Sequence, residues 1–96
     1  MPNAGPHRHR ETMIILGDLD TRRFLPWIER HVSKLGLSKH IVHAANDRIV
    51  MEVDGPLELI DALEMACSLG PITVWVDRVD RTAKPSNGRD TGQRRR

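Results

Sequence analysis

Apolar residues along the centre of the chain follow two different spacings. Four short segments are apolar runs or alternate between apolar and polar positions, which is typical of β-strands. These segments are 12–16, 40–44, 48–54 and 72–79. Two longer segments carry apolar residues three and four positions apart, as along one face of a helix. The first is 24–37, and the second is opened by Gly55-Pro56 and ended by Gly70-Pro71. The polar segment 17–23 is predicted as a loop, so the predicted order is strand, helix, strand, strand, helix, strand.

Proline, glycine and asparagine mark the ends of several predicted elements. Pro26 suits the first turn of the first helix, because its missing N–H would have no partner there. Gly36 is typical of a left-handed residue that ends a helix. Asn46 and Asp47 favour a turn between the second and third strands. These two strands are therefore predicted to form a hairpin.

The fold class follows from this order of elements. Two helices with one apolar face each and four short strands favour a two-layer sandwich with right-handed crossovers. With a hairpin between the two halves, this is the ferredoxin-like α/β (α+β) arrangement, βαββαβ. We expect a mainly antiparallel four-stranded sheet with both helices on one face. The predicted domain covers residues 12–80, and the polar segments 1–11 and 81–96 are predicted to be disordered tails.

Charge is divided unevenly along the chain, whose formal net charge is +2. Six basic residues between 81 and 96 stand against a single aspartate, so the predicted domain itself is mildly acidic. The basic pI is therefore no evidence that the domain binds nucleic acid. Arginines at 94–96 favour only weak, salt-dependent contact with nucleic acid. The third strand has no aromatic residues on which bases would stack, which excludes the usual RNA-recognition mode of this fold class.

The apolar residues and the single cysteine also indicate where in the cell the protein is expected. No apolar run approaches the roughly 20 residues that a membrane span needs, and no secretory signal is predicted. Cys67 is the only cysteine, cannot form an internal disulfide and is expected in the core, which favours the cytoplasm. Trp75 is expected to be a core or half-buried packing residue. The alternative is a contact surface on the open face of the sheet, because Trp75 has the opposite strand parity to Val74 and Val76.

From Gly17 to Val79, the spacing of glycines, prolines, turn residues and apolar residues resembles that of the acylphosphatases without a gap. The matching positions are Gly17, Phe24, Leu35-Gly36-Leu37, Asn46-Asp47, Asp54-Gly55-Pro56, Gly70-Pro71, Val76 and Val79. The resemblance implies hydrolysis of acyl phosphates to carboxylate and phosphate, with no cofactor and no metal. It also implies a phosphate-binding loop between the first strand and the first helix. The residues of that loop are Asp18, Leu19, Asp20, Thr21, Arg22, Arg23 and Phe24.

The sequence departs from the family at the positions that carry its chemistry. Leu25 stands where the family has the arginine that holds the phosphoryl oxygens, and His43 where it has the asparagine that positions the attacking water. Thr21 and Arg23 replace glycines of the loop. If the chain is an enzyme, Arg23 or Arg22 is expected to supply the missing charge.

His43 would then position the water. The alternatives are ordinary surface roles, with the arginines paired to Asp18 and Asp20. His40 and His43 lie three apart on a predicted strand, which places them on opposite faces, so a shared metal is not expected.

Two function classes remain open from the sequence. The first is an acylphosphatase-type hydrolase acting on a small acyl phosphate. The second is a catalytically degenerate module of the same fold that binds a protein partner or a small anion. We expect a monomer without membrane association in either case. Loss of charge-stabilising donors typically costs on the order of 100- to 1,000-fold each in rate, which favours the second class.

Overall fold

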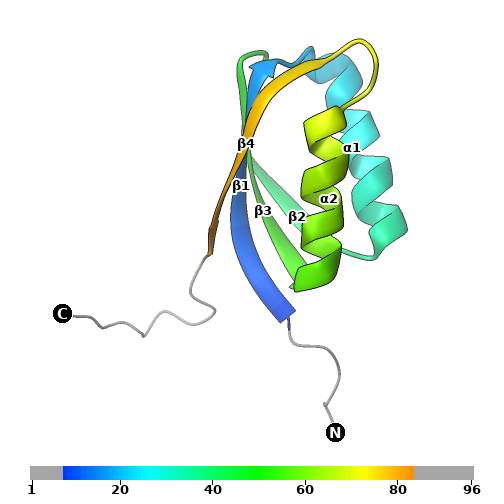
Figure 1. Cartoon of the computed structure of the whole chain (residues 1–96), viewed down its shortest axis with the longest axis vertical. Coiled ribbons are helices and arrows are strands. Elements are labelled where there is room, and N and C mark those ends of the chain that lie inside the picture. Colours follow the sequence, from blue (N-terminus) through cyan, green and yellow to red (C-terminus); the bar gives the residue numbers. More distant parts are fainter. Residues whose placement is uncertain (1–7, 84–96) are drawn as a thin grey trace, which may run out of the picture.

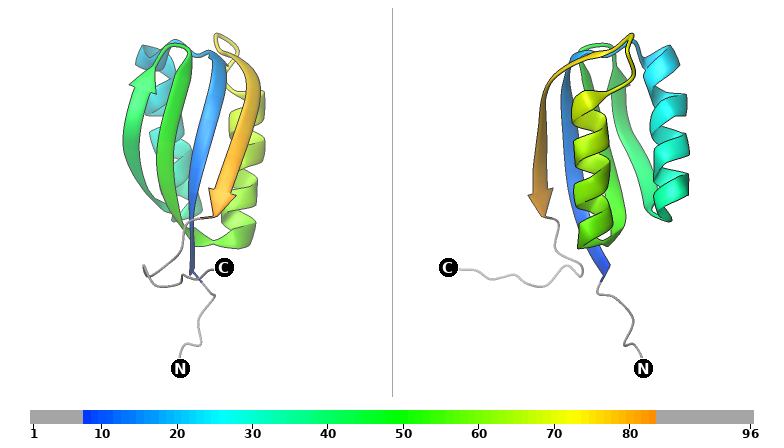
Figure 2. Two further views of the ribbon diagram at one scale, coloured as in Figure 1. Left: turned by 90° about the vertical axis from the view of Figure 1, so that its left-hand side faces the viewer. Right: turned by 45° about the vertical axis from the view of Figure 1, so that its right-hand side comes forward.

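The computed structural model describes residues 8–83, which form six elements (Figure 1). The elements are β1 (Arg8–Asp18), α1 (Thr21–Leu35), β2 (Ser38–Ala45), β3 (Arg48–Pro56), α2 (Leu57–Leu69) and β4 (Trp75–Ala83). The sheet order is β2-β3-β1-β4, and every neighbouring pair is antiparallel. Both helices cover the same face of the sheet (Figure 2). The predicted ferredoxin-like βαββαβ sandwich is confirmed.

The core lies between the sheet and the two helices. β1 is central because it pairs with both β3 and β4, and its Met13 and Ile15 are fully buried. β3 contributes Ile49, Met51 and Val53, also fully buried. The helices contribute Phe24, Ile28, Val32, Ile60, Leu63 and Cys67. Alternation along the strands and helical spacing along the helices therefore aim their apolar side chains at one shared layer.

The first and last strands of the chain extend beyond the predicted domain. β1 begins at Arg8 and β4 ends at Ala83, whereas the domain was expected to cover residues 12–80. Pairing between β1 and β4 continues to Glu11 and Ala83. Glu11 and Arg81, both assigned to tails by the sequence, form an ion pair with Nε and Oε1 2.6 Å apart. The remaining tail predictions, for residues 1–7 and 84–96, lie outside the described residues.

The first helix begins earlier than predicted. β1 extends to Asp18 and α1 starts at Thr21, so most of the predicted loop 17–23 belongs to regular elements. The reason is the backbone of Asp20, whose φ is 42° and whose carbonyl oxygen accepts hydrogen bonds from the Arg23 and Phe24 amides at 3.0 Å. That geometry starts the helix immediately after a sharp turn. The other end of α1 is as predicted, since Gly36 is left-handed with φ 73°.

The hairpin of β2 and β3 is confirmed, but one consequence drawn from β2 is wrong. A bulge at Val42 shifts the register, so that His40 pairs with Glu52 and His43 pairs with Val50. Glu52 and Val50 are two apart on β3 and share a face. His40 and His43 therefore lie on the same face of the sheet, because the bulge adds one residue to β2.

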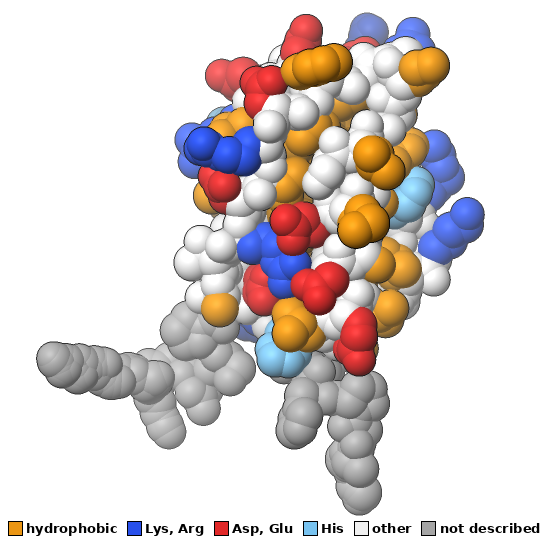
Figure 3. Space-filling model, in the orientation of Figure 1, with side chains coloured by type: hydrophobic (Ala, Val, Ile, Leu, Met, Phe, Trp, Pro, Cys, Tyr) orange, Lys and Arg blue, Asp and Glu red, His pale blue; other side chains and the backbone are white. Residues whose placement is uncertain are grey.

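Exposed apolar side chains occur on both layers of the molecule. Trp75 is 71% exposed, while its neighbour Val74 is buried, so the expectation that Trp75 is a core or half-buried packing residue is wrong. On the helical layer, hydrophobic and acidic side chains lie close together over α2 (Figure 3). Within residues 8–83, no helix is long and apolar enough to cross a membrane.

Candidate functional site

The turn between β1 and α1 is where the sequence predicts a phosphate-binding loop. β1 bends at Gly17, where the register with β4 shifts. Only Leu19 and Asp20 separate the strand from the helix. Leu19 and Phe24 are fully buried, so they anchor both sides of the turn in the core. The turn is thus a tight, core-anchored connection that ends at the N-terminus of α1.

The amides of this turn donate to acceptors within the chain. Gly17 N donates to the Asp47 carbonyl oxygen at 3.3 Å, and Leu19 N donates to the Asn46 carbonyl oxygen at 2.7 Å. Thr21 N donates to Asn46 Oδ1 at 3.0 Å. Amides that bind an anion must point outward without such partners. Among the predicted cradle residues, the amides of Leu19 and Thr21 are therefore bonded to the β2–β3 turn, while those of Arg23 and Phe24 are bonded to the Asp20 carbonyl oxygen.

Asn46 is the residue of this site that sequence reasoning missed. Its Oδ1 accepts from both the amide and the Oγ1 of Thr21, at 3.0 and 3.1 Å. Asp20, the residue just before α1, makes no side-chain capping bond. Asn46 therefore caps α1 from another element, and its only signal in the sequence was local, that of a turn residue in the hairpin.

The two candidate arginines lie at the surface. Arg22 and Arg23 are exposed on the first turn of α1. Arg23 Nε lies 3.4 Å from Asp20 Oδ2, with both side chains largely solvated. This pairing matches the surface role that the sequence analysis gave as the alternative for Arg23. With Asp18 and Asp20 beside Arg22 and Arg23, the formal charge of the turn is balanced.

Leu25 is held by packing. It is partly buried and lies against the hydrophobic core of the domain. An arginine in the resembling family occupies this position, whereas here the side chain contributes to the interior. The turn therefore lacks a fixed cation at that position.

His43 belongs to a different surface. It is exposed on the open face of the sheet, opposite Val50 of β3. Among the described residues, no hydrogen bond or ion pair joins His43 to Arg22 or Arg23. No group of three or more metal-ligating side chains gathers within residues 8–83.

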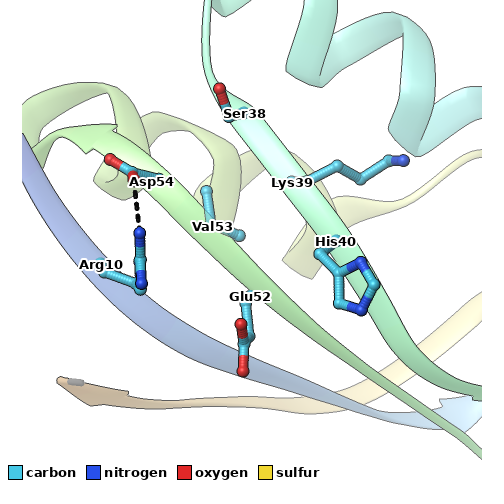
Figure 4. Close-up of a pocket in the computed structure, with 7 residues that line it drawn as sticks. All are labelled: Arg10, Ser38, Lys39, His40, Glu52, Val53 and Asp54. Atoms are coloured by element: carbon cyan, nitrogen blue, oxygen red, sulfur yellow. Dashed lines mark hydrogen bonds and ion pairs between the residues drawn. The ribbon is translucent and has the colours of Figure 1, made fainter. Parts of the chain in front are cut away.

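A surface hollow of about 270 Å³ lies elsewhere on the sheet, where β2 begins and β3 ends (Figure 4). Its lining residues are Arg10, Ser38, Lys39, His40, Glu52, Val53 and Asp54. Arg10 Nη2 pairs with Asp54 Oδ2 at 3.4 Å across the hollow. None of the predicted cradle residues lines it. This mixed-charge hollow is therefore distinct from the β1–α1 turn.

Comparison with known proteins bears on the fold. No protein-family model matches the sequence, and no curated protein sequence matches it. Among solved structures, an acylphosphatase from Coxiella burnetii is similar with a TM-score of 0.74 and 13% identity, over 86% of this chain and 87% of that one. An acylphosphatase from Bacillus subtilis gives 0.73 and 16%, over 85% of this chain and 90% of that one.

A third structure, full-length HypF in its phosphate- and nucleotide-bound form, gives a TM-score of 0.74 at 16% identity. The match covers 90% of this chain but 11% of HypF. The TM-scores establish a shared fold, and identities of 13–16% leave the activity open. The chain thus has the fold of the acylphosphatases, as the spacing of its glycines, prolines and apolar residues indicated.

Proposed function

We propose that this chain, built on the acylphosphatase fold, is a binding module for a protein partner and does not hydrolyse acyl phosphates at enzyme speed. The observation that carries the proposal is the set of hydrogen bonds in the β1–α1 turn. The amides of Gly17, Leu19 and Thr21 all donate to the β2–β3 turn. An incoming phosphate would have to displace these bonds before it could be held.

The charges around the turn support the same conclusion. Stabilising the transition state of phosphoryl transfer requires donors and cations that are fixed before the reaction begins. Leu25 is packed against the core, and Arg23 is solvated beside Asp20. His43 is exposed on the open face of the sheet and makes no bond to either arginine within the described residues. A site with these features lacks the fixed positive charge that catalysis needs.

Hydrolysis of acyl phosphates is the second candidate function. It is favoured by the TM-scores of 0.74 and 0.73 with two acylphosphatases. In that case Arg22 or Arg23 would hold the phosphoryl oxygens and His43 would position the attacking water. The buried free thiol of Cys67 suits a reducing compartment such as the cytoplasm under either candidate.

Benzoyl phosphate distinguishes the two candidates. The purified wild-type chain should leave its hydrolysis at the background rate, because no fixed cation faces the turn. Turnover on the order of 10 per second or more, lost in Arg23→Gln or Arg22→Gln, would overturn the binding-module proposal. A titration with inorganic phosphate, followed by NMR, should leave the amide signals of Leu19 and Thr21 unmoved. Saturable shifts of both signals would favour the enzyme.

A further inference from the structure

The outward face of α2 carries an apolar surface that the core does not use. Met65 is 69% exposed, Leu69 is 77% exposed, and Ile72 in the loop that follows is fully exposed. Together with Leu57 they make four of the six large hydrophobic side chains that are exposed within residues 8–83. Figure 3 shows hydrophobic side chains gathered over this helix. We call Met65, Leu69 and Ile72 the α2 ridge.

The helical period explains why the ridge faces solvent. Ile60, Leu63 and Cys67 are the buried residues of α2. Met65 and Leu69 are four residues apart, so they share the opposite face of the helix. A hollow of about 440 Å³ adjoins them, lined by Asp61, Glu64, Met65, Ser68 and Leu69. The ridge therefore offers both protruding apolar side chains and a recess beside them.

Acidic groups line the hollow beside the ridge. Arg81 Nη1 contacts Asp61 Oδ1 and Glu64 Oε1, each at 2.7 Å, and its Nε contacts Glu11. Three carboxylates against one guanidinium leave this cluster negative. Glu58 adds a further exposed carboxylate in the first turn of α2. An apolar recess with a negative rim is complementary to a cationic amphipathic surface.

We propose that the α2 ridge docks a basic amphipathic helix of a partner protein, which places apolar side chains on Met65 and Leu69 and lysines or arginines against the carboxylates. This inference rests on the proposed binding function and names its surface. A second copy of the chain fits poorly, because two α2 helices would oppose acid to acid. An anionic membrane surface fits poorly for the same reason.

A synthetic peptide tests the inference directly. The probe has about 18 residues, with leucines on one helical face and lysines beside them. Two matched peptides serve as comparisons, one with glutamates in place of lysines and one with the same residues scrambled. Titration by fluorescence anisotropy against the full chain should give saturable binding to the basic peptide only. Its affinity should fall at least about tenfold for Leu69→Ser, as for a central interface residue.

Matched variants separate the ridge from other surfaces. Glu58→Gln should lower the affinity for the basic peptide and reduce the salt dependence of binding. This substitution leaves the Arg81 cluster intact. Trp75→Ser removes an exposed aromatic from the other layer and should change the affinity less than about twofold. Circular dichroism of each variant checks that the fold is kept. Equal binding of all peptides, or an affinity unchanged by Leu69→Ser, would overturn the inference.

Three further outcomes would assign the ridge to a different occupant and overturn the proposal. These are concentration-dependent dimerisation that Leu69→Ser abolishes, binding to phosphatidylserine vesicles, and tighter peptide binding when Arg94, Arg95 and Arg96 are all changed to glutamine. The last would mean that the chain's own basic end competes for the ridge. If the basic peptide does not bind and benzoyl phosphate is hydrolysed only at the background rate, this inference alone is overturned. Rapid hydrolysis overturns the proposed function whatever the peptide does.

Discussion

At the scale of single residues, Gly17 is fixed by the close approach of two backbones. It lies at the bulge where β1 leaves its register with β4, and its φ is 155°. A Cβ atom added there would collide with the carbonyl oxygen of Trp75, which is backbone and cannot swing away. Gly36 also has a positive φ, of 73°, but a Cβ there would meet nothing within 4 Å.

Alanine at these two glycines should therefore have unequal effects. Gly36→Ala should lower the free energy of unfolding by about 1 kcal/mol, from backbone conformation alone. Gly17→Ala should cost about 1–3 kcal/mol beyond that, because the strands must also separate. Urea denaturation of both variants measures the difference. Equal losses would mean that β4 does not lie against Gly17 as described.

Cys67 gives a prediction about pH. Burial in the core, with a smaller contribution from Glu64, raises the pKa of the thiol from 9.0 to about 12. The native thiol should therefore resist alkylation by iodoacetamide at pH 8 and react once the chain is unfolded in urea. Because the folded state holds this proton more tightly, the thiol stabilises the fold fully below pH 9 and progressively less up to about pH 12.

The Cys67→Ala variant is the control for this pH dependence. It should be less stable at pH 8, because it leaves a small cavity in the core. It should also lose less stability than the wild type between pH 9 and the start of alkaline unfolding. Rapid labelling of the native thiol, or parallel pH curves for the two proteins, would contradict the burial of Cys67.

At the scale of elements, Asn46 joins the β2–β3 hairpin to α1. Its side chain accepts two hydrogen bonds from Thr21, and α1 has no side-chain cap of its own. Asn46→Ala should lower the free energy of unfolding by about 1–2 kcal/mol, as for loss of a helix cap. Asn46→Asp keeps the acceptor oxygens and should lose less. Thermal denaturation compares the two variants, and equal losses would show that the capping bond contributes little.

At the scale of the whole molecule, Arg81 of β4 joins β1 and β4 to α2. Its guanidinium bonds to Glu11 of β1 and to Asp61 and Glu64 of α2. The hydrogen bond with Glu11 is the first cause of the raised pKa of Arg81, and burial acts in the opposite direction. Glu11 is 8% exposed, so its ion pair with Arg81 lies in a buried position.

Removing the Arg81 guanidinium should leave the buried Glu11 carboxylate without its ion-pair partner. Arg81→Met is expected to cost about 2–3 kcal/mol of unfolding free energy. Arg78→Met is the matched control, because Arg78 and Asp80 form an exposed pair worth about 0–1 kcal/mol. The double variant Glu11→Gln/Arg81→Met should recover part of the loss. Chemical denaturation measures all of these, and equal losses for Arg81→Met and Arg78→Met would contradict the buried pairing.

The sequence by itself determined the order of the elements, the two-layer fold and the hairpin. These features rest on local signals, namely the spacing of apolar residues and the backbone preferences of Gly36, Asn46 and Asp47. The alternation of Ile49, Met51 and Val53 likewise specified which side of β3 is buried, and all three are fully buried. Local patterns sufficed there because hydrophobic burial depends mainly on which face a residue occupies.

Only the tertiary structure decided where the strands end and what fills the β1–α1 turn. Arg81 and Glu11 have little local signal, and they become ordered through each other, across a large separation along the chain. The bulge at Val42 and the Asn46 cap likewise depend on partners from other elements. A polar side chain acquires its role from the atoms opposite it, and those atoms are set only when distant segments meet.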